Sequence, residues 1–162
     1  MFAETGQLHR KFLKAPPRYE IGGFLPDEAE LLPGDGPIDF RPLRSVATGS
    51  ILFFMSPSCS ACNYEAVADF TEMHPQFEYR LFIEGTEGAC TAYIDEHRPR
   101  FPAHRVSYPR LELHLGVVQV PFALVVNNVG QVVNADIFND LNRLTFAATP
   151  LLQVFPDQPA VT

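Results

Sequence analysis

Two cysteines separated by two residues lie between an apolar run and a segment with helical character. The run at residues 51–55, Ile-Leu-Phe-Phe-Met, predicts a buried strand, and a helix is predicted over residues 60–73. Cys59 is therefore expected at a strand-to-helix junction, where unpaired backbone N–H groups and the helix dipole favour a thiolate. Cys62 is close enough to form a small disulfide with it. The pattern indicates a thiol–disulfide redox centre.

Other uses of a Cys-x-x-Cys pair fit the sequence less well. A structural zinc site needs four ligands, and the remaining candidates show no second paired spacing: Cys90, His9, His74, His97, His104 and His114. A structural disulfide stabilises most when it closes a long loop, whereas this one would span only two residues. We therefore place redox chemistry ahead of zinc binding and of a purely structural bridge.

The third cysteine, Cys90, lies among small residues. We expect it to be a small buried side chain, since free cysteines are often buried. The alternative is a third reactive thiol that forms mixed disulfides.

Composition limits the class of protein. With 162 residues, 46% of them hydrophobic, the chain has the size of one globular domain with a substantial core. Its net charge of −7 argues against nucleic-acid binding, which needs a basic surface. No apolar run reaches the length of a membrane span, and the first six residues lack the apolar core of a signal peptide.

Three regions can be distinguished along the chain. Residues 1–45 are rich in proline and glycine, and they predict an extension with a short helix at residues 5–13 and one or two short strands. Residues 46–148 form the main domain. Three prolines follow Thr149, so residues 149–162 are predicted to be a loosely ordered tail.

The main domain alternates between strand and helix patterns. Strands are expected at residues 50–55, 78–83, 101–108, 122–126 and 131–137, and helices at residues 60–73, 89–97, 111–115 and 139–148. Asn128-Val129-Gly130 predicts a tight antiparallel hairpin between the last two strands. The order predicts an α/β fold with a central mixed β-sheet flanked by helices.

Pro121 precedes the strand expected at residues 122–126. A proline at a strand start is tolerated because no ladder N–H is needed there. In the alternative, the Val120–Pro121 bond is cis and faces the two cysteines, so that the backbone of Val120 pairs with a substrate peptide. We predict the cis arrangement beside Cys59.

The cysteine motif, the Val120-Pro121 step and the hairpin together resemble thioredoxin-fold proteins over residues 50–148. The Ser-Pro-Ser sequence before Cys59 and residues 6–10 resemble the membrane-anchored, periplasmic thioredoxin-like proteins of the methylamine-utilisation (MauD-like) and TlpA-like groups. The resemblance implies thiol–disulfide exchange with protein cysteines, with Cys59 as the attacking thiol and Cys62 as the resolving thiol. The residues expected to contact the substrate are Ser58, Ser60, Ala61, Val120 and Pro121.

The resemblance also implies a place and a partner. The client would be a protein outside the cytoplasm: a quinoprotein dehydrogenase subunit in the methylamine-utilisation group, or a cytochrome or oxidase under maturation in the TlpA-like group. A second redox protein would recycle the dithiol. We expect the natural protein to begin upstream of Met1 with an apolar anchor of about 20 residues and to face the periplasm. No cofactor and no metal are expected.

The chain departs from the thioredoxin pattern in three ways. It contains no tryptophan, so Ser58 stands where an aromatic residue usually precedes the first cysteine. The residues between the cysteines, Ser60 and Ala61, do not include the usual proline. Phe53 occupies the position of the buried carboxylate, so proton transfer from Cys62 needs another group. These departures leave the direction of electron flow open, because it depends on how far the reduced form is stabilised.

A metallochaperone is the alternative function. Cys59 and Cys62 would then hold copper(I) through their soft thiolates. Thioredoxin-fold copper chaperones usually show a wider cysteine spacing and a distal histidine, for which His114 is only a nominal candidate.

Overall fold

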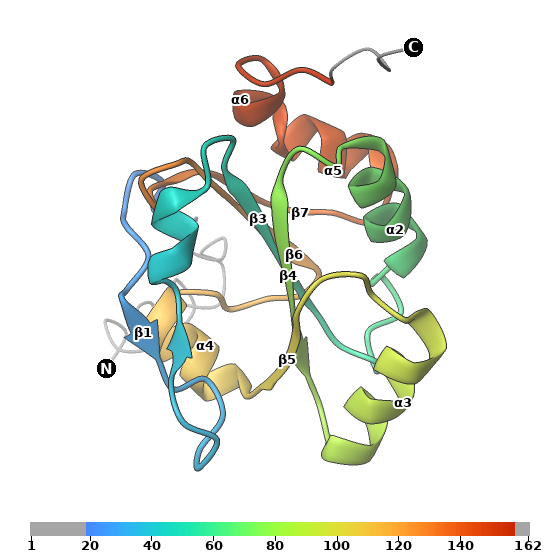
Figure 1. The fold of residues 1–162 in the computed structure, drawn as a ribbon. Helices are drawn as coiled ribbons and strands as arrows, with labels where there is room; N and C mark the ends of the chain where they lie inside the picture. Colours follow the sequence, from blue (N-terminus) through green and yellow to red (C-terminus); the bar gives the residue numbers. More distant parts are fainter. Residues whose placement is uncertain (1–18, 158–162) are drawn as a thin grey trace, which may run out of the picture.

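A mixed five-stranded β-sheet forms the centre of the structure, a computed structural model that describes residues 19–157. The strands lie in the order β5-β4-β3-β6-β7 (Figure 1). Their bounds are Ser50–Met55 for β3, Glu78–Glu84 for β4, Ala103–Val106 for β5, Phe122–Val126 for β6 and Val132–Ile137 for β7. β3, β4 and β5 are parallel, whereas β6 is antiparallel to both β3 and β7. The predicted α/β fold with a central mixed sheet is confirmed.

The two faces of the sheet are covered differently (Figure 1). One face packs against helices α2 (Tyr64–Met73), α3 (Glu87–His97), α5 (Leu141–Ala147) and α6 (Thr149–Leu152). The other face packs against β1 (Glu28–Ala29), β2 (Ile38–Asp39), the 3-10 helix η1 (Arg41–Ser45) and α4 (Tyr108–Leu115). Each face therefore has its own hydrophobic core.

The apolar run in β3 contributes to both cores. Successive side chains of a strand point to opposite faces, so Phe53 lies in the core under the helices while Leu52 and Phe54 lie in the other core. All six residues of β3 are buried. A central strand that is covered on both faces needs apolar residues at nearly every position, which explains why the sequence here is a continuous run.

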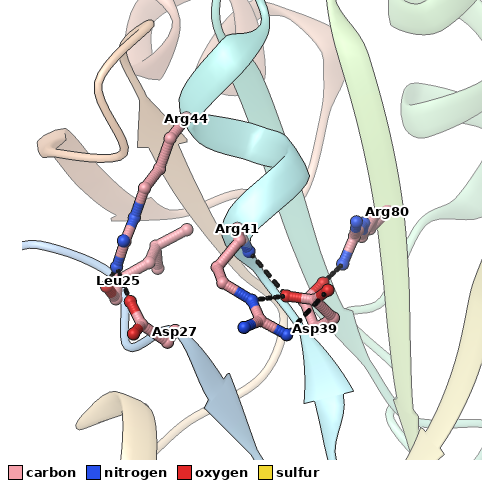
Figure 2. Close-up of polar contacts among 6 residues, drawn as sticks. All are labelled: Leu25, Asp27, Asp39, Arg41, Arg44 and Arg80. Atoms are coloured by element: carbon pink, nitrogen blue, oxygen red, sulfur yellow. Dashed lines mark hydrogen bonds and ion pairs between the residues drawn. The ribbon is translucent and has the colours of Figure 1, made fainter.

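Polar contacts attach the N-terminal layer, which consists of β1, β2 and η1, to the sheet (Figure 2). Arg41 of η1 pairs with the Asp39 carboxylate at 2.9 Å. Arg80 of β4 donates a hydrogen bond to the backbone carbonyl of Asp39 at 2.8 Å. Within the layer, Arg44 forms an ion pair with Asp27. β1 and β2, which are the short strands expected before residue 45, are thereby fixed beside β4.

Two predictions about helices are wrong. The first helix of the main domain begins at Tyr64 rather than at residue 60. The chain after Thr149, predicted to be loosely ordered, forms α6, and Leu151 is buried in the core. Pro150 lies in the first turn of α6 and Pro109 in the first turn of α4, which also begins earlier than predicted. Proline suits the first turn because its missing N–H is not needed there, so neither proline breaks a helix.

The predicted helix at residues 5–13, the segment at residues 6–10 and residues 158–162 lie outside the described residues. Within residues 19–157, no helix is long and apolar enough to cross a membrane.

Candidate active site

The two cysteines lie in a loop of consecutive turns between β3 and α2. The Cys59 N–H donates to the Ser56 carbonyl at 3.1 Å, and the Cys62 N–H donates to the Cys59 carbonyl at 3.3 Å. Asn63 is the N-cap residue, and its extended backbone (φ −96°, ψ 98°) separates this loop from α2. The sequence predicted Cys59 directly at a helix N-terminus, and this prediction is wrong, because Cys59 lies before the N-cap residue Asn63. The preference of asparagine for the N-cap position was the signal that could have placed the helix start correctly.

This correction removes one argument for the reactivity of Cys59. The helix dipole acts mainly within the first turn of a helix, and Cys59 precedes the N-cap of α2. Its chemistry therefore depends on its immediate neighbours instead.

The sheet brings the Val120–Pro121 step to the cysteine loop. β3 ends at Met55 and its antiparallel neighbour β6 begins at Phe122, so both junctions lie at the same edge of the sheet. The Val120–Pro121 bond is cis, as predicted. The Cys59 Sγ–H donates to the Val120 carbonyl oxygen over 3.9 Å. The structure thus places Cys59, Val120 and Pro121 together.

The five residues proposed as substrate contacts differ in exposure. Ser58, Ser60 and Ala61 are exposed in the cysteine loop, whereas Val120 is half-buried and Pro121 is buried. Cys59 itself is half-buried, and its sequence neighbours Ser58 and Ser60 are exposed. The cysteine loop is thus part of the protein surface.

Cys62 has a different environment. It is half-buried and packs against the hydrophobic core beneath the helices. Burial, reinforced by a side-chain hydrogen bond with Cys59, raises the pKa of the Cys62 thiol to about 12. A backbone hydrogen bond from Ser56 opposes this rise only in part. Cys62 therefore remains a protonated thiol at neutral pH in the reduced protein.

Phe53, which stands at the position of the thioredoxin carboxylate, belongs to the core that Cys62 packs against. Phe53 is fully buried, and its ring lies 5.8 Å from that of Tyr79, 6.2 Å from that of Phe101 and 5.9 Å from that of Phe138. This aromatic packing leaves no room for a hydrated acid. The departure from the thioredoxin pattern at Phe53 therefore changes the chemistry available to Cys62.

An aromatic group that the sequence analysis missed packs beside the start of α2, on the core that Cys62 also contacts. Tyr93 of α3 packs against Tyr64 with ring centroids 6.0 Å apart and against His97 at 4.3 Å. Burial raises the pKa of Tyr93, and the negative charge of a Cys62 or Cys59 thiolate raises it further. The signal in the sequence was the spacing of Tyr93 and His97, which places both on one face of a helix.

Cys90 is a buried side chain, as predicted. It is 2% exposed, and its Sγ–H donates to the Ile83 carbonyl at 3.7 Å. Burial raises the pKa of the Cys90 thiol. Its surroundings favour the unreactive, protonated form.

The copper alternative gains no third ligand from the geometry. Among residues 19–157, no group of three or more cysteine, histidine, aspartate or glutamate side chains is arranged to hold a metal ion. His114 lies in the last turn of α4 and is exposed.

A cavity of about 610 Å³ lies alongside α2, between that helix and the segment that joins α3 to β5. Tyr64, Glu72, His97 and Arg98 are among the residues that line it, but neither Cys59 nor Cys62 is. The dithiol thus lies outside this cavity, in a surface loop. A surface position suits exchange with a protein better than with an enclosed small molecule.

Comparisons with known proteins agree on the fold. No protein-family profile matches the chain, and no curated protein sequence matches it. Many solved structures are similar, and three of them illustrate the likeness. A hypothetical protein from Sinorhizobium meliloti has a TM-score of 0.67 at 13% identity and covers 90% of this chain and 91% of its own. A provisionally named thiol:disulfide interchange protein DsbE from Chlorobium tepidum has a TM-score of 0.66 at 13% identity. The match covers 83% of this chain and 99% of the Chlorobium tepidum chain. A secreted disulfide oxidoreductase from Mycobacterium tuberculosis has a TM-score of 0.56 at 18% identity. The match covers 76% of this chain and 94% of the Mycobacterium tuberculosis chain.

These identities are too low to transfer an activity, but the shared architecture extends over most of every chain compared. The part of the chain that the structure describes therefore has the thioredoxin-like fold.

Proposed function

We propose that this protein is a thiol–disulfide oxidoreductase that acts on the cysteines of other proteins through Cys59 and Cys62. The observation that carries the proposal is the position of the Cys59 sulfur. It belongs to a half-buried residue in a surface loop and lies 3.9 Å from the carbonyl oxygen of Val120. A substrate backbone that pairs with Val120 would bring its own disulfide to this sulfur. The names of the similar structures from Chlorobium tepidum and Mycobacterium tuberculosis support the same activity.

The proposed reaction has two exchange steps. The Cys59 thiolate attacks one sulfur of a client disulfide, so that a Cys59–client disulfide forms and one client thiolate leaves. Cys62 then loses its proton and attacks the Cys59 sulfur. This step forms the Cys59–Cys62 disulfide and releases the second client thiolate. The client disulfide is reduced by two electrons, the dithiol is oxidised, and each client thiolate takes up a proton. The reverse sequence donates the disulfide to a client.

The activity can be tested with insulin as the protein disulfide and a dithiol reductant, with insulin reduction measured by turbidity. We expect the wild-type chain to accelerate the reduction and Cys59→Ser to abolish the acceleration. Cys62→Ser should accumulate a mixed disulfide with the client, because the resolving step is missing. Cys90→Ser is the matched control, since the third cysteine is buried, and it should retain activity. Equal activity in Cys59→Ser and the wild type would refute the proposal.

The reduction potential decides the direction. A value near the −270 mV of thioredoxin indicates a reductant, and a value near the −120 mV of DsbA indicates an oxidant. Equilibration of the Cys59–Cys62 pair with glutathione measures it.

We further propose that the protein works outside the cytoplasm on a client under disulfide formation or maturation, as MauD-like and TlpA-like proteins do. The Ser-Pro-Ser sequence before Cys59 supports this location, and so does the description of the similar Mycobacterium tuberculosis protein as secreted. Fractionation of cells that express the natural gene tests it: an anchored protein is expected in the membrane fraction, where protease added to spheroplasts should digest it. Recovery from the cytoplasm alone would refute it.

A further inference from the structure

The resolving thiol faces a chemical difficulty at its site. Cys62 must become a thiolate to attack the mixed disulfide, yet its burial favours the protonated form. Phe53, at the position of the thioredoxin carboxylate, packs among aromatic rings of the same core and supplies no acid. Another group must stabilise the negative charge on its sulfur as the proton leaves.

The Tyr93 hydroxyl is available for this purpose. Its oxygen is buried and has no hydrogen-bond partner among residues 19–157. Buried hydroxyl groups are nearly always hydrogen-bonded, so an unpartnered one needs an explanation. Two other buried side-chain atoms of the described chain share this property, Ser50 Oγ and His74 Nε2. Of these three residues we consider Tyr93, because it packs against the same hydrophobic core as Cys62.

The ring of Tyr93 is held between two other aromatic side chains. Its ring packs edge-on against Tyr64, which follows Cys62 by two residues, and against His97. Both Tyr93 and Cys62 pack against the hydrophobic core under the helices. The ring therefore has little freedom, and it lies on the same core that Cys62 contacts.

We propose that the Tyr93 hydroxyl donates a hydrogen bond to the Cys62 sulfur as that sulfur becomes a thiolate during resolution. The proposal rests on the proposed function and assigns a stabilising donor to its second step. The proton of Cys62 passes through water to the departing client thiolate, the Cys62–Cys59 bond forms, and the Cys59–client bond breaks. Tyr93 keeps its own proton throughout.

The groups around Tyr93 make it a donor rather than a base. Burial and the fields of Cys62, Tyr64, Cys59 and Glu96 all raise its pKa, so the hydroxyl stays protonated over the working pH range. A neutral hydroxyl without a partner stabilises a new charge nearby at little cost, because no existing hydrogen bond has to break.

Tyr93→Phe tests the proposal, because it removes only the hydroxyl oxygen. The reduced full chain, with Cys90→Ser as a common background, is mixed with dithiobis(nitrobenzoate), an aromatic disulfide whose thiolate product is coloured. Cys59 attack releases the first coloured thiolate, and Cys62 attack on the mixed disulfide releases the second. We expect Tyr93→Phe to leave the first phase unchanged and to slow the second about tenfold, the effect of losing one hydrogen bond to a charged sulfur. The pH profile of the second phase should move to higher pH.

Tyr64→Phe is the matched control, since it removes a hydroxyl from the neighbouring ring, and it should leave both phases unchanged. Because the Tyr93 hydroxyl has no partner in the reduced protein, Tyr93→Phe should melt at the wild-type temperature or above it. An unchanged second phase in Tyr93→Phe overturns the proposal. An equal slowing in Tyr64→Phe, or a slowing of both phases together with a lower melting temperature in Tyr93→Phe, also overturns it. A parent protein that releases only one coloured thiolate refutes the proposed function instead.

Discussion

The Cys59 sulfur and the Val120 carbonyl oxygen lie 3.9 Å apart although 61 positions separate the two residues in the sequence. The antiparallel pairing of β3 with β6 produces this proximity, because one strand ends where the other begins. Cys62 lies on the core side of the same loop. The two thiols thus have distinct environments, one accessible to a client and one held against the core.

This difference predicts the order in which the cysteines react. We expect iodoacetamide at neutral pH to label Cys59 first and Cys90 only after unfolding. Cys62 has a pKa of about 12, so its thiolate fraction is small at neutral pH and grows about tenfold per pH unit. In the Cys59→Ser variant, burial still raises the pKa of the Cys62 thiol. The rate at which Cys62 is labelled should therefore keep rising through pH 9 without a plateau. Peptide mass spectrometry measures the order, and Cys62 labelled before Cys59 would reverse the assigned roles.

A second prediction concerns the position where thioredoxin carries its buried acid. Phe53→Asp removes an aromatic ring that packs on Tyr79, Phe101 and Phe138 and buries a charge there. We expect it to lower the free energy of unfolding by at least about 4 kcal/mol, and Phe53→Leu by about 1 kcal/mol. Urea denaturation measures both. If Phe53→Asp is as stable as the wild type and speeds resolution, the site accepts an acid and the aromatic packing is not decisive.

The sequence was sufficient for the sheet but not for the start of α2. β3 and β6 have the predicted bounds, because an apolar run flanked by Ser, Pro or Gly leaves little freedom for the ends of a buried strand. The helix start depended on a local competition. Ser58, Ser60 and Asn63 all favour turns, and the extended backbone of Asn63 delays the helix.

In the candidate site, too, the sequence was sufficient for some residues and not for others. The cysteine pair and Pro121 could be found from spacing and turn chemistry along the chain. Tyr93 could not, because its relation to Cys62 depends on how α3 and α2 pack side by side on one face of the sheet. Tertiary packing of this kind leaves only a weak helical spacing in the sequence.

Two glycines form a matched pair for testing backbone constraints. At Gly49, φ is +101° and an added Cβ would lie 2.6 Å from the Val126 carbonyl oxygen. Gly88 lies in α3, and an added Cβ would meet nothing within 4 Å. We expect Gly49→Ala to destabilise the fold by about 2 kcal/mol or more, since both strain and a clash act there. Gly88→Ala should stabilise it by up to about 1 kcal/mol. Thermal melts of both variants check the signs, and a destabilising Gly88→Ala would show that α3 does not tolerate a side chain at that position.

The last prediction concerns the end of the described chain, where Asp157 accepts a hydrogen bond from Nδ1 of the buried His74 at 2.7 Å. Gln76 also donates to the Asp157 carboxylate, at 3.0 Å. These hydrogen bonds, that of His74 foremost, lower the pKa of Asp157 below its usual value. A lowered pKa in the folded state means that the stabilisation is present above the ordinary aspartate pKa and is lost as the pH falls through the lowered value.

Asp157→Asn should therefore melt below the wild type at pH 6, and the difference should vanish towards pH 2, where the carboxyl group is protonated in both states. The effect should be small, because Asp157 is largely exposed and solvent screens the interaction. Asp95→Asn is the matched control: this exposed carboxylate lies on α3, and it should show no such pH dependence. A melting difference for Asp157→Asn that persists unchanged to pH 2 would mean that the carboxylate charge does not hold the C-terminal segment against α2.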